Sequence, residues 1–334
     1  MTDGSGFCPF RPDPPRPDEL VRWPATFGTR FIVFCDVEEE FDWRAPLSRD
    51  AHSTTAMAAF PDAHRRFADL GIPLTCMVDY PVATDPRAVA ILGRATEDGR
   101  SAIGAQLHPW VTPPFDEAVT PANSYAGNLP VALEAAKIDT LTDALTTAFG
   151  RAPVAYRAGR YGLGPATLSL LSERGYRLDS SIRALYDYRG DGGPDYRDID
   201  STTFRRDGVI AVPFTSIFTG SLNRRGALLH RLATHIPRGP GALARTCLVN
   251  RVSLTPEDMP LAQALDAVER AKNNGLRLLA FSFHSPSLVP GHTPYVRTAA
   301  DLDDFWHWWI GMAAHLGRLD IRPATLDEVL AAAD

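Results

Sequence analysis

The chain has 334 residues, with 34 basic and 40 acidic side chains, a net charge of −6 and 45% hydrophobic residues. This is the composition of an ordinary globular protein, long enough for two average domains or one large α/β barrel. The mild acidity and the scattering of the arginines argue against a concentrated basic face, so we expect neither nucleic acid nor a membrane as partner.

The cysteines and the N-terminal segment indicate the redox state and the cellular location of the protein. Four widely spaced cysteines, Cys8, Cys35, Cys76 and Cys247, form no CxxC pair. Two of them fall in apolar runs, so we expect reduced thiols in the core. Residues 1–27 are rich in proline and are expected to form an irregular arm. No signal-peptide core and no apolar run of membrane-spanning length is found, which favours a cytoplasmic protein.

Beyond this arm, short apolar runs alternate with longer amphipathic segments. Strands are predicted at 30–36, 72–78, 102–107, 153–157, 176–179, 208–213 and 277–283. Apolar residues at helical spacing predict helices near 51–70, 86–98, 130–149, 165–174, 258–274 and 299–317.

This alternation is typical of parallel strands joined by crossover helices. No GxGxxG turn and no P-loop is present, which disfavours a nucleotide-binding fold and favours a (β/α) barrel. We therefore expect one α/β domain over residues 28–334, with seven parallel strands and a long insertion around 183–257.

Charged and ligand-type residues follow the predicted strands at their carboxyl ends. In a (β/α) barrel these ends converge on one face, where active sites are built. The residues in question are Asp36, Glu38, His108, Arg157, Asp179 and His284.

Five segments around these residues resemble, in order, the five motifs of the NodB-homology polysaccharide deacetylases, carbohydrate esterase family four. They are FCDVEEEFDW (34–43), GAQLHPWVTPPF (104–115), YRAGRYGLG (156–164), LDSSI (178–182) and FSFHSPSLVPG (281–291). The residues of these motifs are most similar to those of the WalW-like subgroup, and the resemblance covers residues 28–325. It implies a distorted (β/α) barrel that hydrolyses an N-acetyl or related acyl group with water activated on a zinc-like ion.

Amide hydrolysis requires a nucleophilic water, a base, a positive centre for the oxyanion and an acid for the leaving amine. The resemblance implies that Asp36 is the base and that Arg157 pairs with it and keeps it ionised. It implies that His284 protonates the leaving group. Asp179 is expected to accept a hydrogen bond from this histidine.

The resemblance implies Glu38 and His108 as ligands of a divalent metal, with zinc first. Gln106 stands where the family places another imidazole, and an amide is a poor ligand for zinc. It could instead orient a water molecule, bind the acyl group of the substrate, or mark a site that no longer holds metal.

A saccharide or other small molecule is the expected substrate. Arg160 and Tyr161 stand where the family lines the substrate groove. A guanidinium at this place suits an anionic or hydroxyl-rich ligand. The rings of Trp43, Trp110 and Tyr161 could stack on sugars or simply pack against the protein.

Three functions therefore stay open. The first is removal of an acyl group from nitrogen of an amino-sugar or glycoside-like metabolite. The second is hydrolysis of another C–N bond, as in cyclic amides or ureides. The third, motivated by Gln106, is metal-free chemistry or carbohydrate binding without turnover.

Overall fold

The computed structural model describes residues 9–236, 239–246 and 248–333. Cys35 and Cys76 are free thiols in the core, as expected. Cys8, Cys247 and the first eight residues of the proline-rich arm lie outside the described residues. The rest of the arm runs along the barrel, where Glu19 pairs with Arg206 at 2.9 Å.

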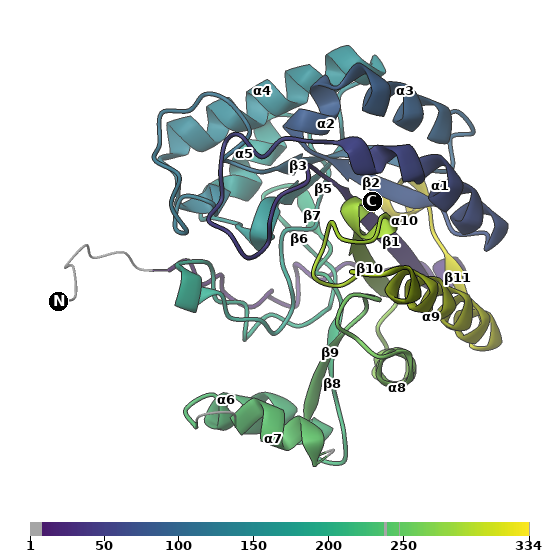
Figure 1. Cartoon of the computed structure of the whole chain (residues 1–334). Helices are drawn as coiled ribbons and strands as arrows, with labels where there is room; N and C mark the ends of the chain where they lie inside the picture. The colour runs from purple at the N-terminus through teal and green to yellow at the C-terminus, as the bar shows by residue number, and fades with distance from the viewer. Residues whose placement is uncertain (1–8, 237–238, 247, 334) are drawn as a thin grey trace.

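A curled sheet of nine strands forms the centre of the molecule (Figure 1). The strand order is β10-β1-β2-β3-β4-β5-β7-β6, with β11 beside β1, and every pair is parallel except β6 and β7. All seven predicted strands are present, which confirms the expected distorted (β/α) barrel. They are β1 (Thr29–Val37), β2 (Leu74–Val78), β3 (Ala102–Leu107), β4 (Ala155–Ala158), β5 (Leu178–Asp179), β7 (Val209–Ala211) and β10 (Leu278–His284), joined by the short β6 (Phe204–Arg206) and β11 (Ile321–Pro323).

Helices cover the outside of this sheet (Figure 1). They are α1 (Phe60–Asp69), α2 (Tyr80–Thr84), α3 (Pro86–Ala95), α4 (Val131–Phe149), α5 (Thr167–Glu173), α8 (Leu261–Asn273) and α9 (Ala299–Arg318). The last helix, α10 (Leu326–Ala333), packs against the interior of the barrel instead. Local signals set their ends: α4 stops at Gly150, which has a φ of 72°, and α9 starts with a capping box between Thr298 and Asp301. None of the described helices is both long and apolar enough to span a membrane.

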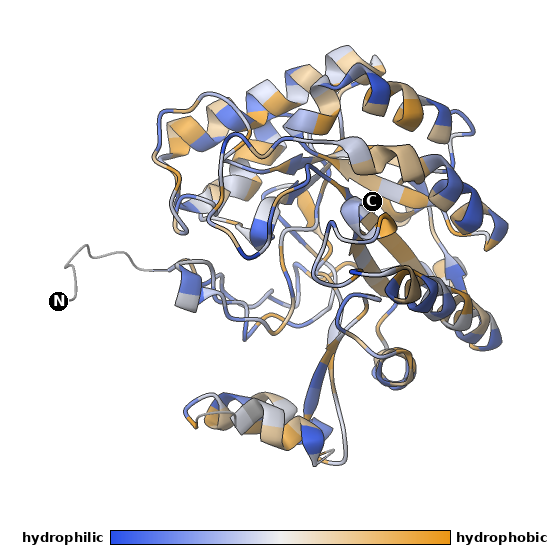
Figure 2. Cartoon of the chain, in the orientation of Figure 1, coloured by the Kyte–Doolittle hydropathy of each residue, from blue (hydrophilic) through white to orange (hydrophobic). Residues whose placement is uncertain are grey.

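The strands of the central sheet are largely apolar (Figure 2). Alternation of side chains along them separates two apolar layers. Phe31, Val33 and Cys35 of β1 pack under the outer helices, whereas Ile32 and Phe34 point into the barrel. Inside, they meet residues of β10, β4 and β7 and the apolar face of α10. Apolar side chains therefore fill the barrel toward the amino ends of its strands. A site can be built only at the carboxyl ends.

The sheet does not close through a ladder between β7 and β10. Instead, Thr215 donates its backbone N–H to Ala280 at 3.2 Å and accepts one from Leu254 at 3.1 Å. Leu254 in turn accepts from Ser282 at 3.3 Å. Thr215 and Leu254, which both lie within the predicted insertion, therefore bridge the gap between β7 and β10.

A module made of residues 216–253 projects from this gap (Figure 1). It consists of a two-stranded antiparallel ribbon, β8 (Ser216–Thr219) and β9 (Asn250–Ser253), with α6 (Gly226–Ala233) and α7 (Gly239–Arg245) at its tip. The stretch 216–256 contains six arginines and no Asp or Glu. Its exposed large apolar side chains are Leu222, Leu228, Leu232, Ile236 and Leu248.

A buried carboxyl group on α4 makes the stability of the fold depend on pH. Glu134 is 1% exposed and accepts a hydrogen bond from Thr167. Burial raises its pKa from 4.5 to about 7, which the hydrogen bond from Thr167 only partly offsets. The folded state therefore holds this proton more tightly than the unfolded state, so the free energy of unfolding falls as pH rises from 4.5 to 7.

Glu134→Gln keeps an acceptor for Thr167 but has no proton to lose. We expect the variant to gain about 2–3 kcal/mol of stability over the parent at pH 8 and little at pH 4.5. Urea denaturation at both pH values measures this difference. Glu173→Gln, a change on the exposed surface of α5, is the control, and an equal gain there would contradict the assignment to Glu134.

Candidate active site

Inside the barrel, polar side chains replace apolar ones at the carboxyl ends of the strands. Asp36 lies two residues beyond Phe34 on β1, and Ser282 lies two residues beyond Ala280 on β10. Gln106 and Arg157 occupy the paired positions of β3 and β4. Because residues two apart share a face of a strand, these side chains meet in one layer above the core.

Asp36 and Arg157 form a buried ion pair. Nη1 of Arg157 lies 2.5 Å from Oδ1 of Asp36 and donates to Ser282 Oγ at 2.6 Å. Its Nη2 donates to Ser180 Oγ at 3.0 Å. The guanidinium is thus fixed in place by three oxygen atoms, with its positive charge directly beside the Asp36 carboxyl group.

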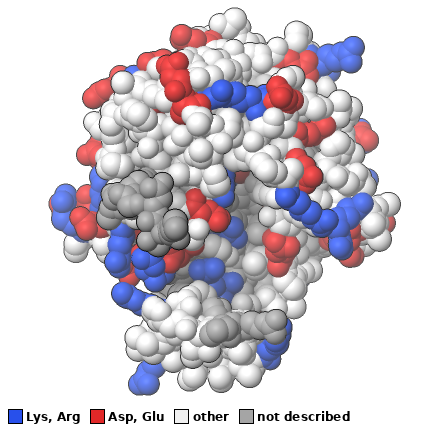
Figure 3. All heavy atoms as spheres, turned by 60° about the vertical axis from the view of Figure 1, so that its left-hand side comes forward, with Lys and Arg blue, Asp and Glu red and all other residues white. Residues whose placement is uncertain are grey.

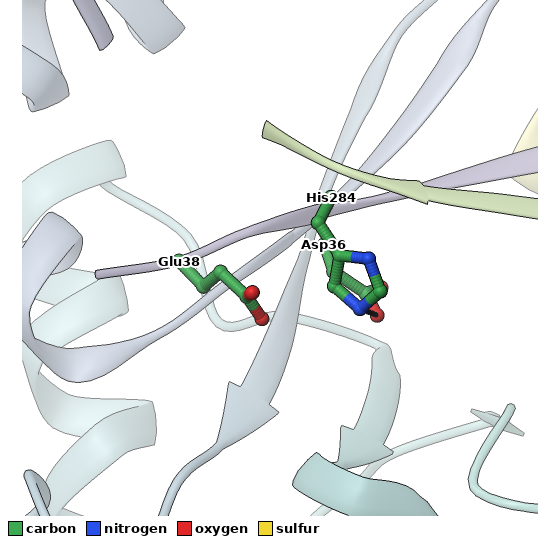
Figure 4. Close-up of side chains that lie close together, drawn as sticks. All are labelled: Asp36, Glu38 and His284. Carbon is green, nitrogen blue, oxygen red and sulfur yellow. Dashed lines mark ion pairs between the residues drawn. The ribbon is translucent and has the colours of Figure 1, made fainter. Parts of the chain in front are cut away.

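His284, at the end of β10, lies across from Asp36 (Figure 4). Its Nε2 is 3.7 Å from Oδ2 of Asp36, the oxygen opposite the one that Arg157 contacts. Its Nδ1 is 2.7 Å from Oε2 of Glu257, and its backbone N–H donates to Oε1 of the same carboxylate at 3.1 Å. Burial lowers the pKa of His284, but Glu257 and Glu38 outweigh that effect and raise it to about 10.

The expectation that Asp179 holds this histidine is wrong. Asp179 accepts hydrogen bonds from the hydroxyl and the backbone N–H of Ser181. Its neighbour Ser180 reaches Arg157 inside the barrel, so Asp179 points to the opposite side of β5. The carboxylate that contacts His284 is Glu257, which follows β9 in the predicted insertion.

Glu38, Gln106 and His108 meet beside Asp36. Oε2 of Glu38 is 3.1 Å from Nε2 of Gln106 and 3.6 Å from Nε2 of His108. Gln106 Nε2 is also 3.2 Å from His108 Nε2. All three side chains are buried, and burial raises the pKa of Glu38 to about 8 even though His284 and His108 lower it.

His108 is oriented by three neighbours, of which the sequence singles out only Trp110, and for another role. Its Nδ1 is 2.7 Å from Oε2 of Glu39, whose other oxygen accepts from the Trp110 indole at 2.8 Å. The Trp110 ring stacks on His108 with centroids 4.3 Å apart. Gly159 lies against the opposite side, since a Cβ there would overlap the imidazole. His108 Nε2 is therefore held toward Glu38.

These residues fit a divalent cation. Oε1 of Glu38 and Oε1 of Gln106 are buried and have no hydrogen-bond partner in the described part of the chain. Rotating the Gln106 amide by half a turn places its oxygen where Nε2 now faces Glu38 and His108. One carboxylate, one imidazole and one amide oxygen are then available together, and Asp36 and His284 lie near the same carboxylate.

Aromatic and arginine side chains surround this centre in a cavity of about 490 Å³. Trp43 lines this cavity, where its ring stacks on Phe41 at 4.9 Å and makes a T-shaped contact with His284 at 5.1 Å. Arg160 and Tyr161 both have left-handed backbone angles, with φ of 55° and 59°. Such strain is tolerated where it positions functional side chains, and both residues line the cavity.

The predicted substrate-binding residues are not equally accessible. Trp110 is only 2% exposed because its ring is used against His108 and its N–H against Glu39. Gln106 is also 2% exposed and contacts Glu38. Acidic and basic side chains are interspersed on the face in Figure 3, and several basic ones lie beside its central recess.

Fold and site together define a curled (β/α) barrel with a cluster of Asp, Arg and His side chains at the carboxyl ends of its strands. No known protein family matches the sequence, and no curated protein matches it. Solved structures do match, among them several polysaccharide and peptidoglycan deacetylases.

Three of these structures show the extent of the likeness. A presumed polysaccharide deacetylase from Mycobacterium smegmatis is 20% identical with a TM-score of 0.48, over 93% of this chain and 98% of that one. Peptidoglycan deacetylase PdaC from Bacillus subtilis is 12% identical with a TM-score of 0.40, over 92% and 91%. The 4-alpha-glucanotransferase from Thermococcus litoralis is 13% identical with a TM-score of 0.51, over 91% of this chain and 40% of that one. At such identities the likeness concerns the fold alone.

Proposed function

We propose that this chain is a hydrolase of the polysaccharide-deacetylase kind, which removes an acetyl or related acyl group from nitrogen of a saccharide. One observation carries the proposal: Nε2 of His284 lies 3.7 Å from Oδ2 of Asp36. Each of the two side chains is also held by a group of opposite kind, Asp36 by the cationic Arg157 and His284 by the acidic Glu257. Arg157 contacts one oxygen of Asp36 and leaves the other toward His284, whereas Glu257 favours the protonated form of His284. A carboxyl group that can act as base and an imidazole that can act as acid therefore face each other.

The chain's own residues define the proton transfers. Oδ2 of Asp36, free of the contact with Arg157, accepts the proton of the attacking water. His284 donates its Nε2 proton to the leaving nitrogen, while Glu257 holds Nδ1 and keeps the ring oriented. The Asp36 side chain is only 4% exposed, whereas the His284 side chain is 18% exposed, and both line the cavity.

Glu38, His108 and Gln106 would hold the metal. A divalent cation bound there supplies the positive charge that polarises the acyl oxygen and eases deprotonation of water. Two oxygen donors and one imidazole suit manganese as well as zinc. Zinc remains the first candidate because of the motif resemblance, which also motivates the WalW-like assignment.

The metal part of the proposal is tested by adding the imidazole that the motif usually contains. We expect Gln106→His to bind zinc at least about tenfold more tightly, because imidazole is a better zinc ligand than an amide. Competition with a chromophoric chelator measures this without any activity assay. Gln263→His, on the exposed surface of α8, is the matched control. Equal zinc affinity of parent and Gln106→His would contradict the ligand set.

The deacylation itself is tested by acetate release from N-acetylated amino sugars, with metal-loaded and chelator-treated protein compared. We expect release that depends on metal. Hydrolysis of cyclic amides or ureides alone would support the second function, which the same acid–base pair could serve. Binding of saccharides without hydrolysis would support the third. The cytoplasmic location and the absence of nucleic-acid and membrane partners stay predictions.

A further inference from the structure

Three arginines line the cavity, and they differ in how their charge is balanced. Arg157 is paired with Asp36, and Arg160 lies 3.5 Å from Asp191. Within the described ranges, no carboxylate oxygen lies within 4.0 Å of the Arg183 guanidinium. Asp258 is the nearby acid whose carboxyl group senses this charge, from beyond ion-pair distance. Arg183 is thus a cation in the cavity without a direct counter-ion.

Neutral groups hold Arg183 in place. Its guanidinium carbon lies 3.9 Å from the centre of the Tyr186 ring and 5.2 Å from that of Phe214. Its Nη2 donates to Ser253 Oγ and to the Tyr186 hydroxyl, both at 3.1 Å. These contacts fix the plane of the guanidinium but do not neutralise it. A preoriented, unneutralised guanidinium binds carboxylate or phosphate oxygens well.

Arg183 lies close to the proposed chemistry. The centre of the Tyr161 ring is 5.7 Å from its guanidinium carbon and 5.8 Å from that of Arg157, which contacts Asp36. The two guanidinium groups are therefore no farther apart than a short saccharide can span. A ligand whose acyl group reaches Asp36 can place a neighbouring substituent at Arg183.

We propose that Arg183 binds an anionic group of the substrate, so that the chain prefers acylated sugars that carry a carboxylate or a phosphate. This inference rests on the proposed function for the nature of the sugar, but its test measures binding and not turnover. Carboxylate and phosphate offer the same anionic oxygens, and the two are distinguished by separate probes.

The test compares three probes by ligand-observed NMR titration: N-acetylglucosamine, N-acetylmuramic acid and N-acetylglucosamine 6-phosphate. We expect the parent protein to bind at least one anionic probe about tenfold more tightly than the neutral one. Arg183→Gln should lose that preference while the affinity for the neutral probe changes less than about twofold. Whichever anionic probe is preferred identifies carboxylate or phosphate.

Arg251→Gln is the matched control. Arg251 packs on the same Tyr186 ring, at 3.5 Å, but does not line the cavity. It should therefore keep the preference for the anionic probe. Equal affinity of the parent for neutral and anionic probes would overturn the proposal, even if Arg183→Gln does not fold. So would an equal loss of both affinities in Arg183→Gln. Anionic preference without acetate release would uphold this site and overturn the proposed hydrolysis.

Discussion

Asp36→Asn is expected to lower kcat for acyl hydrolysis by about a thousandfold. The amide cannot take the proton of the attacking water, and it leaves Arg157 buried at 1% exposure without its ionised partner. The loss should fall on kcat more than on KM, because the side chain acts in proton transfer. Steady-state acetate release measures the effect.

Asp42→Asn is the matched control for this variant. Asp42 lines the same cavity but is exposed, so the same chemical change there should alter kcat less than about threefold. Circular dichroism shows whether Asp36→Asn still folds. A folded Asp36→Asn protein with parental kcat would rule out Asp36 as the base.

His284→Gln should lower kcat by about a hundredfold or more, because the leaving nitrogen then receives no proton. The smaller change Glu257→Gln tests whether Glu257 keeps the His284 imidazole protonated. Glu257 is among the groups that raise the pKa of His284 to about 10, so its removal should lower that pKa. The protonated acid is then lost at lower pH, and the alkaline limb of the kcat profile moves toward neutrality.

The direction of this shift separates a positioning role from a merely structural one. If Glu257 only stabilised the fold, Glu257→Gln would lower the free energy of unfolding and leave the pH profile of the folded protein unchanged. A profile that keeps its alkaline limb in Glu257→Gln would contradict the proposed link. Ser287→Ala removes a hydroxyl that donates to Glu257 and contacts Thr293 but leaves the carboxylate in place, so it should shift the limb less.

The barrel could be predicted from the sequence because its signals are local. Apolar runs such as 30–36 and 277–283 are short, continuous and bounded by turn residues, so each specifies a strand by itself. Alternation with amphipathic segments then leaves few arrangements other than a parallel barrel. Side chains directly after these strands, such as Asp36 and His284, are placed together by the same rule.

The remaining features depend on contacts between distant segments. Glu257 lies 27 residues before His284 and follows an antiparallel strand in the insertion, where the rule for parallel strands does not apply. The local signal was weak, since only three of residues 249–254, which precede Thr-Pro-Glu, are apolar. Asp179 was misplaced by one residue of strand alternation, because Ser180 and not Asp179 faces the interior.

One continuous stretch of the sequence, most of which forms the projecting module, is rich in arginine. The stretch 216–256 carries six positive charges and no negative ones, so the rest of this chain of net charge −6 carries −12. The molecule is therefore an electric dipole whose positive end is the projecting module. At low ionic strength it should turn in the field of an acidic surface and approach that surface with the module first, although its total charge is repelled.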